Sequence, residues 1–171
     1  MARYWLTTHW PSEKRNNQPR RHLYLRSEHS AVGTEVRPGD FVLMFELRTC
    51  RAQVEKGAPS RSTSKVSKVK GARGIVSLGK VATEFRKIDV PPDRVLHFDG
   101  KEYRWEWVAQ TREEEAGFVP FTEVNRVLKF KKGSRMRGFG IRHSGLGELS
   151  AEQFNELAEI FRRTELPAEF R

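Results

Sequence analysis

The histidine and cysteine side chains are not spaced in a way that predicts a metal centre or a catalytic thiol. Five histidines are spread over 171 residues without an H-x-x-x-H pair, at positions 9, 22, 29, 97 and 143. Cys50 is the single cysteine and lies in a basic segment. We therefore expect neither a zinc site built from ligands close in the sequence nor a disulfide framework.

Two glycine-containing stretches resemble nucleotide-binding loops only superficially. GFGIR (138–142) and GLGELS (145–150) each contain G-x-G. Both lack the third glycine and the preceding strand of a dinucleotide-binding motif. We predict turns at both places, and no cofactor.

Acidic side chains offer two candidates for acid/base chemistry. Glu113–Glu115 are three consecutive acids, which we predict to be a solvated turn between strands. Glu46 ends an apolar run, where a carboxylate needs a partner. That partner is either a group on a ligand or an arginine, Arg48 or Arg73. Neither candidate demands an enzyme, and we predict that the protein is not one.

A large aromatic ring stands where the first predicted strand gives way to a polar loop. Trp5 lies in the strand-like run YWL, and TTHW follows at residues 7–10. We predict that Trp5 belongs to the core. Trp10 either covers the open end of that core or offers its face to a ligand.

The positive charge of the chain is concentrated in two segments. Residues 48–73 hold eight Lys or Arg and one acid, and residues 129–142 hold six and none. The formal net charge is +10, yet the rest of the chain has 18 basic and 21 acidic residues. Local basicity on a nearly neutral body is typical of proteins that bind polyanions. The alternative is a solvated surface loop that aids solubility.

Hydrophobic patterning predicts a chain rich in β-strands. The turn RPGD (37–40) leads into a strand at 41–47, and a second strand is expected within 74–85. Residues 48–73 between them have almost no large apolar side chain. A connection this long predicts a functional or disordered loop.

A third pattern alternates with a period of two. In KEYRWEWVAQ (101–110), Tyr103, Trp105, Trp107 and Ala109 share one face, which we expect to be the interior of a sheet or barrel. LKFKK (128–132) continues this pattern and predicts a further strand.

The C-terminal segment predicts an amphipathic helix. Ser150 and Gln153 form a capping box, and Leu149 with Phe154 forms a hydrophobic staple. The helix should pack on the sheet and end near Thr164, before Pro167. Its apolar stripe consists of Phe154, Leu157, Ala158, Ile160 and Phe161. A short helix is a further candidate within 12–31.

These elements predict one domain over residues 1–171. Several short strands, one long loop and a closing helix indicate an α+β fold, a partly open β-barrel with a C-terminal helix packed on it. No signal peptide and no apolar run of membrane-spanning length is apparent. We therefore expect a soluble, cytoplasmic protein.

Three motifs in order resemble the EVE domain of the PUA superfamily. They are YWL (4–6), VRPGDFVLMFE (36–46) and RGIVSLGKV (73–81). The family typically shows a YWL-type first strand, then VGDLVLFY and then PGIVGIAEV. The segment 136–161 also looks like the end of EVE-like domains of restriction systems. The resemblance covers most of the chain, although each motif is short.

The resemblance implies a PUA-like barrel without catalytic activity, related to the YTH readers of methylated RNA. EVE-like domains are linked to prokaryotic defence, where they recognise modified DNA bases and direct a nuclease to them. Such a reader binds duplex DNA and flips the modified base into a pocket with aromatic walls. Modified cytosine, such as 5-methylcytosine, is the first expectation and N6-methyladenine the second.

The resemblance also implies which residues form the pocket. In the family the loop after the first strand contributes to it, often through SEP or a Lys-Ser pair, and this chain has THW there instead. This departure leaves the preferred modification open. The expected pocket residues are Thr7, Thr8, His9, Trp10, Phe45, Glu46 and Trp107. Trp10 and Phe45 would stack on the base, and Glu46 would accept from an exocyclic amine. The alternatives place Trp10 and Trp107 in the core.

The two basic segments and the turn before the last helix would grip the phosphates. The expected backbone contacts are Arg61, Lys65, Lys68, Lys70, Arg135, Arg137, Arg142, His143 and Ser144. Two other functions stay open from the sequence: a PUA-like module that binds structured RNA, and an RNA-modifying or hydrolytic enzyme that uses Glu46 or residues 113–115.

Overall fold

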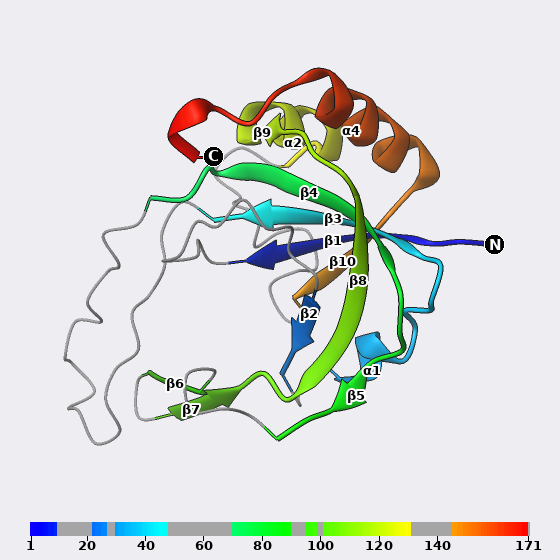
Figure 1. The fold of residues 1–171 in the computed structure, drawn as a ribbon, viewed down its shortest axis with the longest axis vertical. Coiled ribbons are helices and arrows are strands. Elements are labelled where there is room, and N and C mark those ends of the chain that lie inside the picture. Colours follow the sequence, from blue (N-terminus) through cyan, green and yellow to red (C-terminus); the bar gives the residue numbers. More distant parts are fainter. Residues whose placement is uncertain are drawn as a thin grey trace.

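The computed structural model describes residues 1–9, 22–26, 30–47, 70–89, 95–98, 101–130 and 145–170 (Figure 1). The side chains of residues 30, 95–98, 101–103, 113 and 114 are outside this description. The strands are β1 (Tyr4–His9), β2 (His22–Leu25), β3 (Phe41–Glu46), β4 (Gly74–Val81), β5 (Arg86–Lys87), β6 (Val95–Phe98), β7 (Lys101–Arg104), β8 (Trp107–Glu115), β9 (Val119–Pro120) and β10 (Leu146–Leu149). The helices are α1 (Ser30–Gly33), α2 (Phe121–Leu128), α4 (Ala151–Arg163) and the 3-10 turn η4 (Ala168–Phe170).

One curled sheet forms the body of the fold. Its strands lie in the order β10-β1-β3-β4-β8-β2, with β5 also paired to β8 and β9 to β4. All of these pairs are antiparallel except β1 with β3, which run side by side in the same direction (Figure 1). β6 and β7 form a separate hairpin.

The curl brings the two edge strands of the sheet toward each other. Leu23 and Leu25 of β2 and Leu146 of β10 belong to one buried cluster. The position that a Cβ would occupy on Gly145 lies 3.7 Å from a methyl group of Leu25. The edges therefore meet through side chains. The predicted α+β class and the C-terminal helix packed on the sheet are confirmed, and the curled, half-barrel sheet is compatible with the predicted partly open β-barrel.

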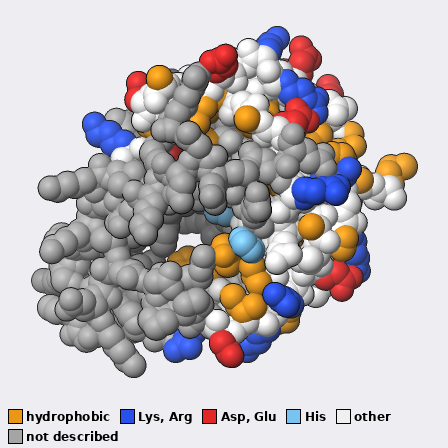
Figure 2. All heavy atoms as spheres, in the orientation of Figure 1, with side chains coloured by type: hydrophobic (Ala, Val, Ile, Leu, Met, Phe, Trp, Pro, Cys, Tyr) orange, Lys and Arg blue, Asp and Glu red, His pale blue; other side chains and the backbone are white. Residues whose placement is uncertain are grey.

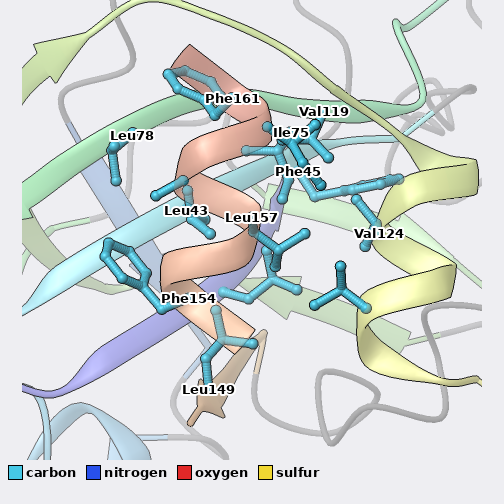
Figure 3. Close-up of a cluster of buried hydrophobic side chains, with 14 of the residues drawn as sticks. Leu43, Phe45, Ile75, Leu78, Val119, Val124, Leu149, Phe154, Leu157 and Phe161 are labelled. Atoms are coloured by element: carbon cyan, nitrogen blue, oxygen red, sulfur yellow. The ribbon is translucent and has the colours of Figure 1, made fainter. Parts of the chain in front are cut away.

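The outer face of the sheet is covered by α2 and α4. Leu43, Phe45, Ile75 and Leu78 of the sheet pack against Phe154, Leu157 and Phe161 of α4 and Val124 of α2 (Figure 3). We call this group, with the other buried residues around it, the helix-side cluster. Packing of this amphipathic stripe is what holds a short helix in place.

The predictions for the C-terminal helix are confirmed. Gln153 N–H donates to Ser150 Oγ, and Ser150 N–H donates to the Gln153 side chain. Thr164 is the C-cap, and the five residues of the predicted stripe are all buried.

The inner face of the curl holds a second core, the inner cluster. Its buried members are Trp5, Leu23, Leu25, Val36, Val42, Met44, Val81, Ala109 and Leu146, with Trp107 packed against them. Trp5 is thus core, as predicted. Its indole Nε1 donates to Asp40 Oδ2 over 2.9 Å, and the guanidinium of Arg3 lies 4.6 Å from its ring centre. Asp40 is the last residue of the predicted turn, in which Gly39 has a left-handed φ of 96°.

Other strand predictions are confirmed only in part. The expected strand at 41–47 is β3, and the one within 74–85 is β4, which ends at Val81. KEYRWEWVAQ is interrupted, because residues 105 and 106 separate β7 from β8. Trp107 and Ala109 do face the inner cluster, but Val108 on the opposite side is buried as well.

Three local predictions are wrong. Residue 128, expected to begin a strand, ends α2, whose apolar side chains Phe121, Val124, Val127 and Leu128 have helical spacing. The predicted turn at 145–150 contains β10. Glu113–Glu115 end strand β8 instead of forming a turn. The candidate helix within 12–31 stays a prediction: residues 22–25 are strand β2 and α1 begins at Ser30, while 12–21 and 27–29 lie outside the described residues.

Among the helices in the described parts of the chain, none has both the length and the apolar character needed to cross a membrane.

Glu115 joins β8 to α4 through a two-point ion pair. Arg162 donates to its carboxylate through both Nε and Nη2. These hydrogen bonds hold the pKa of Glu115 below its ordinary value of 4.5. A depressed folded-state pKa means that the pair stabilises the fold above about pH 4.5, and that this contribution disappears as the pH falls through the lowered value.

We expect Glu115→Gln to lower the free energy of unfolding by about 0.5–1 kcal/mol at pH 7, since both partners are partly exposed. Urea titrations at neutral and acid pH measure this difference, which should vanish once the carboxyl is protonated. Glu159→Gln is the control, because Glu159 is more exposed. An equal loss at both pH values would contradict an electrostatic origin.

Candidate nucleic-acid interface

Polar side chains share the inner face of the sheet where β1 and β3 end. Thr7 of β1 pairs with Met44 of β3, and Met44 pairs with Ser77 of β4. Two residues further along β1 and β3, His9 pairs with Glu46. Residues opposite each other in a sheet point to the same side, and Met44 belongs to the inner cluster. Thr7, His9, Ser77 and Glu46 therefore line one end of the inner face.

Thr7 is fixed by the neighbouring edge strand. It is 3% exposed, and its Oγ1 donates to the carbonyl of Gly145 over 2.8 Å. Gly145 has a left-handed φ of 72°, which favours glycine, and stands just before β10. Thr7 thus holds the barrel edge together and keeps the acceptor capacity of its hydroxyl.

Glu46 is held by the chain that leads into β4. Its side chain is buried, and Oε1 accepts the N–H of Ala72 over 2.8 Å. The approach of the two segments is close, because a Cβ on Gly71 would lie 1.8 Å from the carbonyl oxygen of Leu47. Only glycine fits there. The end of the basic segment 48–73 is therefore attached directly to the Glu46 carboxylate.

Arg73 follows in a strained conformation. Its φ of 52° is unusual for a residue other than glycine, and its guanidinium lies 4.5 Å from the ring centre of Phe121. The carbonyl of Arg73 accepts the N–H of Phe121. Arg73 thus anchors the end of the basic segment to the start of α2.

Two of the predicted pocket residues lie on the other face. Thr8 and Phe45 stand opposite each other in the ladder, and Phe45 is 1% exposed within the helix-side cluster. Phe121 meets it edge-on with ring centres 6.1 Å apart. A base could not stack on Phe45 without opening this core, so the structure does not bring Thr8 and Phe45 together with the other candidates.

Trp107 and His9 are partly buried on the inner side. Trp107 packs against the inner cluster opposite Leu25 of β2. The backbone carbonyl of His9 accepts the N–H of Leu47, which fixes the end of β1 against β3. On the face drawn in Figure 2, histidine side chains (pale blue) lie beside a group of hydrophobic side chains (orange).

Most of the expected phosphate contacts lie outside the described residues. Lys70 is described and exposed, immediately before the Gly71 crossing. Trp10 of the pocket and eight backbone candidates are outside: Arg61, Lys65, Lys68, Arg135, Arg137, Arg142, His143 and Ser144. In the part of the chain that is described, no group of three His, Cys, Asp or Glu side chains is placed to hold a metal ion.

Sequence reasoning missed Ser77. The residue is 2% exposed on β4, in the run GIVSLGKV. A single small polar residue inside an apolar strand was the available signal, since a buried hydroxyl needs a partner.

Comparisons with known proteins bear on the fold. Neither the protein-family models nor the curated proteins give a match. A solved structure that is similar is the NMR structure of Rpa0253 from Rhodopseudomonas palustris, a target of the Northeast structural genomics consortium. It is 13% identical, with a TM-score of 0.51 over 94% of this chain and 93% of that one. The likeness extends over nearly the whole of both chains and concerns the fold alone.

Proposed function

We propose that this chain is a non-catalytic reader of modified bases, with the PUA-like barrel of an EVE domain. It binds duplex DNA and takes one flipped base against the inner face of its sheet. A nuclease on another domain or chain then acts on the marked DNA. Modified cytosine is the first candidate for the base, and N6-methyladenine the second.

The observation that carries the proposal is the attachment of the basic segment to the polar end of the inner face. Lysines and arginines of residues 48–73 supply the charge that neutralises phosphates. Near the end of the same segment, the N–H of Ala72 donates to the Glu46 carboxylate. Backbone binding and base recognition would therefore be adjacent along one short stretch of chain.

The partly open barrel and the three EVE-like motifs support the same function. YWL, FVLMFE and GIVSLGKV become β1, β3 and β4, three neighbouring strands of one sheet. Thr7, His9 and Glu46 come from the first two of them. A carboxylate accepts from an exocyclic amine, and stacking on an aromatic side chain returns about 1–3 kcal/mol per base.

Fluorescence anisotropy at one fixed salt concentration tests the proposal. The probes are one duplex sequence with a central cytosine, 5-methylcytosine, 5-hydroxymethylcytosine, adenine or N6-methyladenine, and an RNA duplex of equal length. We expect at least tenfold tighter binding to one modified DNA duplex, which corresponds to about 1.4 kcal/mol. Equal binding to all DNA duplexes would refute a base reader, and tighter binding to RNA would assign the chain to RNA-binding modules instead.

The basic segment should act on every duplex alike. We expect Lys65→Ala with Lys68→Ala to weaken binding to modified and plain DNA by the same factor. The slope of log K against log salt should fall by about 2, because two phosphate contacts are lost. Lys87→Ala is the control, since Lys87 is exposed on β5 and pairs with Glu106. A selective loss on modified DNA would place these lysines in base recognition.

A further inference from the structure

Ser77 on β4 carries a buried hydroxyl group. Its Oγ is inaccessible to solvent and has no hydrogen-bond partner within the described ranges of the chain. A buried donor left in this state costs about 1–3 kcal/mol. A group that supplies the missing hydrogen bond would recover that cost on binding.

The hydroxyl lies on the same face as the Glu46 carboxylate. Ser77 stands opposite Met44, and Glu46 is two residues further along β3. Such diagonal neighbours are about 7–8 Å apart, within reach of a long side chain or of one bound ring. The ladder also shifts between Met44 and Phe45, and bulges of this kind turn side chains toward sites.

The Ser77 side chain lies on the inner side of the sheet, because it stands opposite Met44 of the inner cluster. Ile75 and Leu78, on either side of it along β4, belong to the helix-side cluster. Thr7 flanks Met44 from β1, with its hydroxyl tied to Gly145. Glu46 and Ser77 therefore present one acceptor and one hydroxyl donor to the inner face.

This pair of groups matches the Watson–Crick edge of only some bases. Cytosine and adenine each present an exocyclic amine next to a ring nitrogen that accepts, whereas thymine, uracil and guanine present a carbonyl next to a ring N–H. Resting on the function proposed above, we propose that Ser77 donates to the ring nitrogen and Glu46 accepts from the amine of a flipped cytosine or adenine. Ser77 is then a specificity-determining residue.

Burial of Ser77 strengthens the discrimination. A site built to hydrogen-bond a substrate group strongly rejects analogues that leave its buried polar groups unpaired. Thymine in this site would place its carbonyl against the carboxylate, and a hydroxyl turned to accept its N–H would leave the buried O–H of Ser77 unpaired.

The matched probes are duplexes that carry 5-methylcytosine or thymine opposite the same guanine. The two bases have the same methyl group and nearly the same shape, and the mismatched thymine is the easier one to extrude. Anisotropy with wild-type protein should show at least tenfold preference for 5-methylcytosine. In Ser77→Ala this preference should fall to about threefold or less, and in Glu46→Gln binding to thymine should rise, since an amide can also donate. The adenine and hypoxanthine pair tests N6-methyladenine in the same way.

Melting temperatures and a control variant separate effects on folding from effects on base preference. Ser77→Ala removes an unsatisfied hydroxyl, so its melting temperature should be unchanged or higher. Thr122→Ala removes an exposed hydroxyl on α2 and should leave both stability and preference unchanged. An unchanged preference in folded Ser77→Ala overturns the inference while leaving the reader intact. Wild-type protein that prefers no modified duplex over a plain one overturns the proposed function itself.

Discussion

Asp40→Ala is expected to lower the free energy of unfolding by about 4 kcal/mol, because it leaves one buried and two partly buried donors without their acceptor. The carboxylate accepts the N–H groups of Arg3 and Arg37 and the indole Nε1 of Trp5, each over 2.9 Å. It is 3% exposed, so water cannot replace it readily. Urea unfolding followed by tryptophan fluorescence measures the loss.

A double-mutant cycle separates these hydrogen bonds from general packing. Trp5→Phe keeps a large ring and removes one donor, which should cost about 1–2 kcal/mol in the wild-type background. In the Asp40→Ala background the same change should cost much less, since the donor has already lost its acceptor. Asp89→Ala, at an exposed carboxylate, should stay within about 0.5 kcal/mol. Additive losses would mean that Trp5 and Asp40 act independently.

Phe161→Ala is expected to cost about 4 kcal/mol, as large apolar truncations in a core do. Phe161 is fully buried near the end of α4, and its carbonyl accepts the N–H of Phe118 (Figure 3). A Cβ on Gly117 would lie 2.0 Å from that carbonyl oxygen, so the connection between β8 and β9 is in close contact with the helix. Thermal and urea unfolding measure the loss.

Two further measurements help to interpret the lower stability of Phe161→Ala. Phe161→Leu preserves much of the volume and should cost about 1.5 kcal/mol or less. Because Phe161 lies on the helix side, any preference for a modified base should survive in the folded variant. If Phe161→Ala lowered the free energy of unfolding by less than Phe161→Leu does, α4 would be only loosely packed on the sheet.

Elements with a strong local signal were predictable from the sequence. The capping box at Ser150 and the apolar stripe of α4 are local, and both are confirmed. The turn at 37–40 and the apolar run after it likewise define β3. Trp5 was recognisable as core from its apolar neighbours.

Elements whose character depends on tertiary pairing were not predictable in the same way. LGEL is a strand only because β1 pairs with it, and the glycines at positions 145 and 147 by themselves favour a turn. Glu115 belongs to a strand because its backbone pairs with Leu78 of β4, which lies far from it in the sequence. The helix α2 was missed because Leu128, its last residue, and Phe130 just beyond it fit a period of two.

The candidate pocket divides for a similar reason. Neighbours in the sequence such as Thr7 and Thr8, or Phe45 and Glu46, were grouped as one site. Once β1 and β3 are strands, alternation sends the members of each pair to opposite faces. Only the pairing of β4 with β3 brings Ser77 to the inner face with Glu46.

The position of β1 between β3 and β10 has a consequence for biosynthesis. β1 is synthesised well before β10, the strand at residues 146–149 that pairs with one of its edges. A nascent chain must therefore carry an open strand edge until β10 has been made, and such edges invite pairing between chains. Translation that stops between β1 and β10 would release a product prone to self-association, so closure of this edge depends on a segment far along the chain.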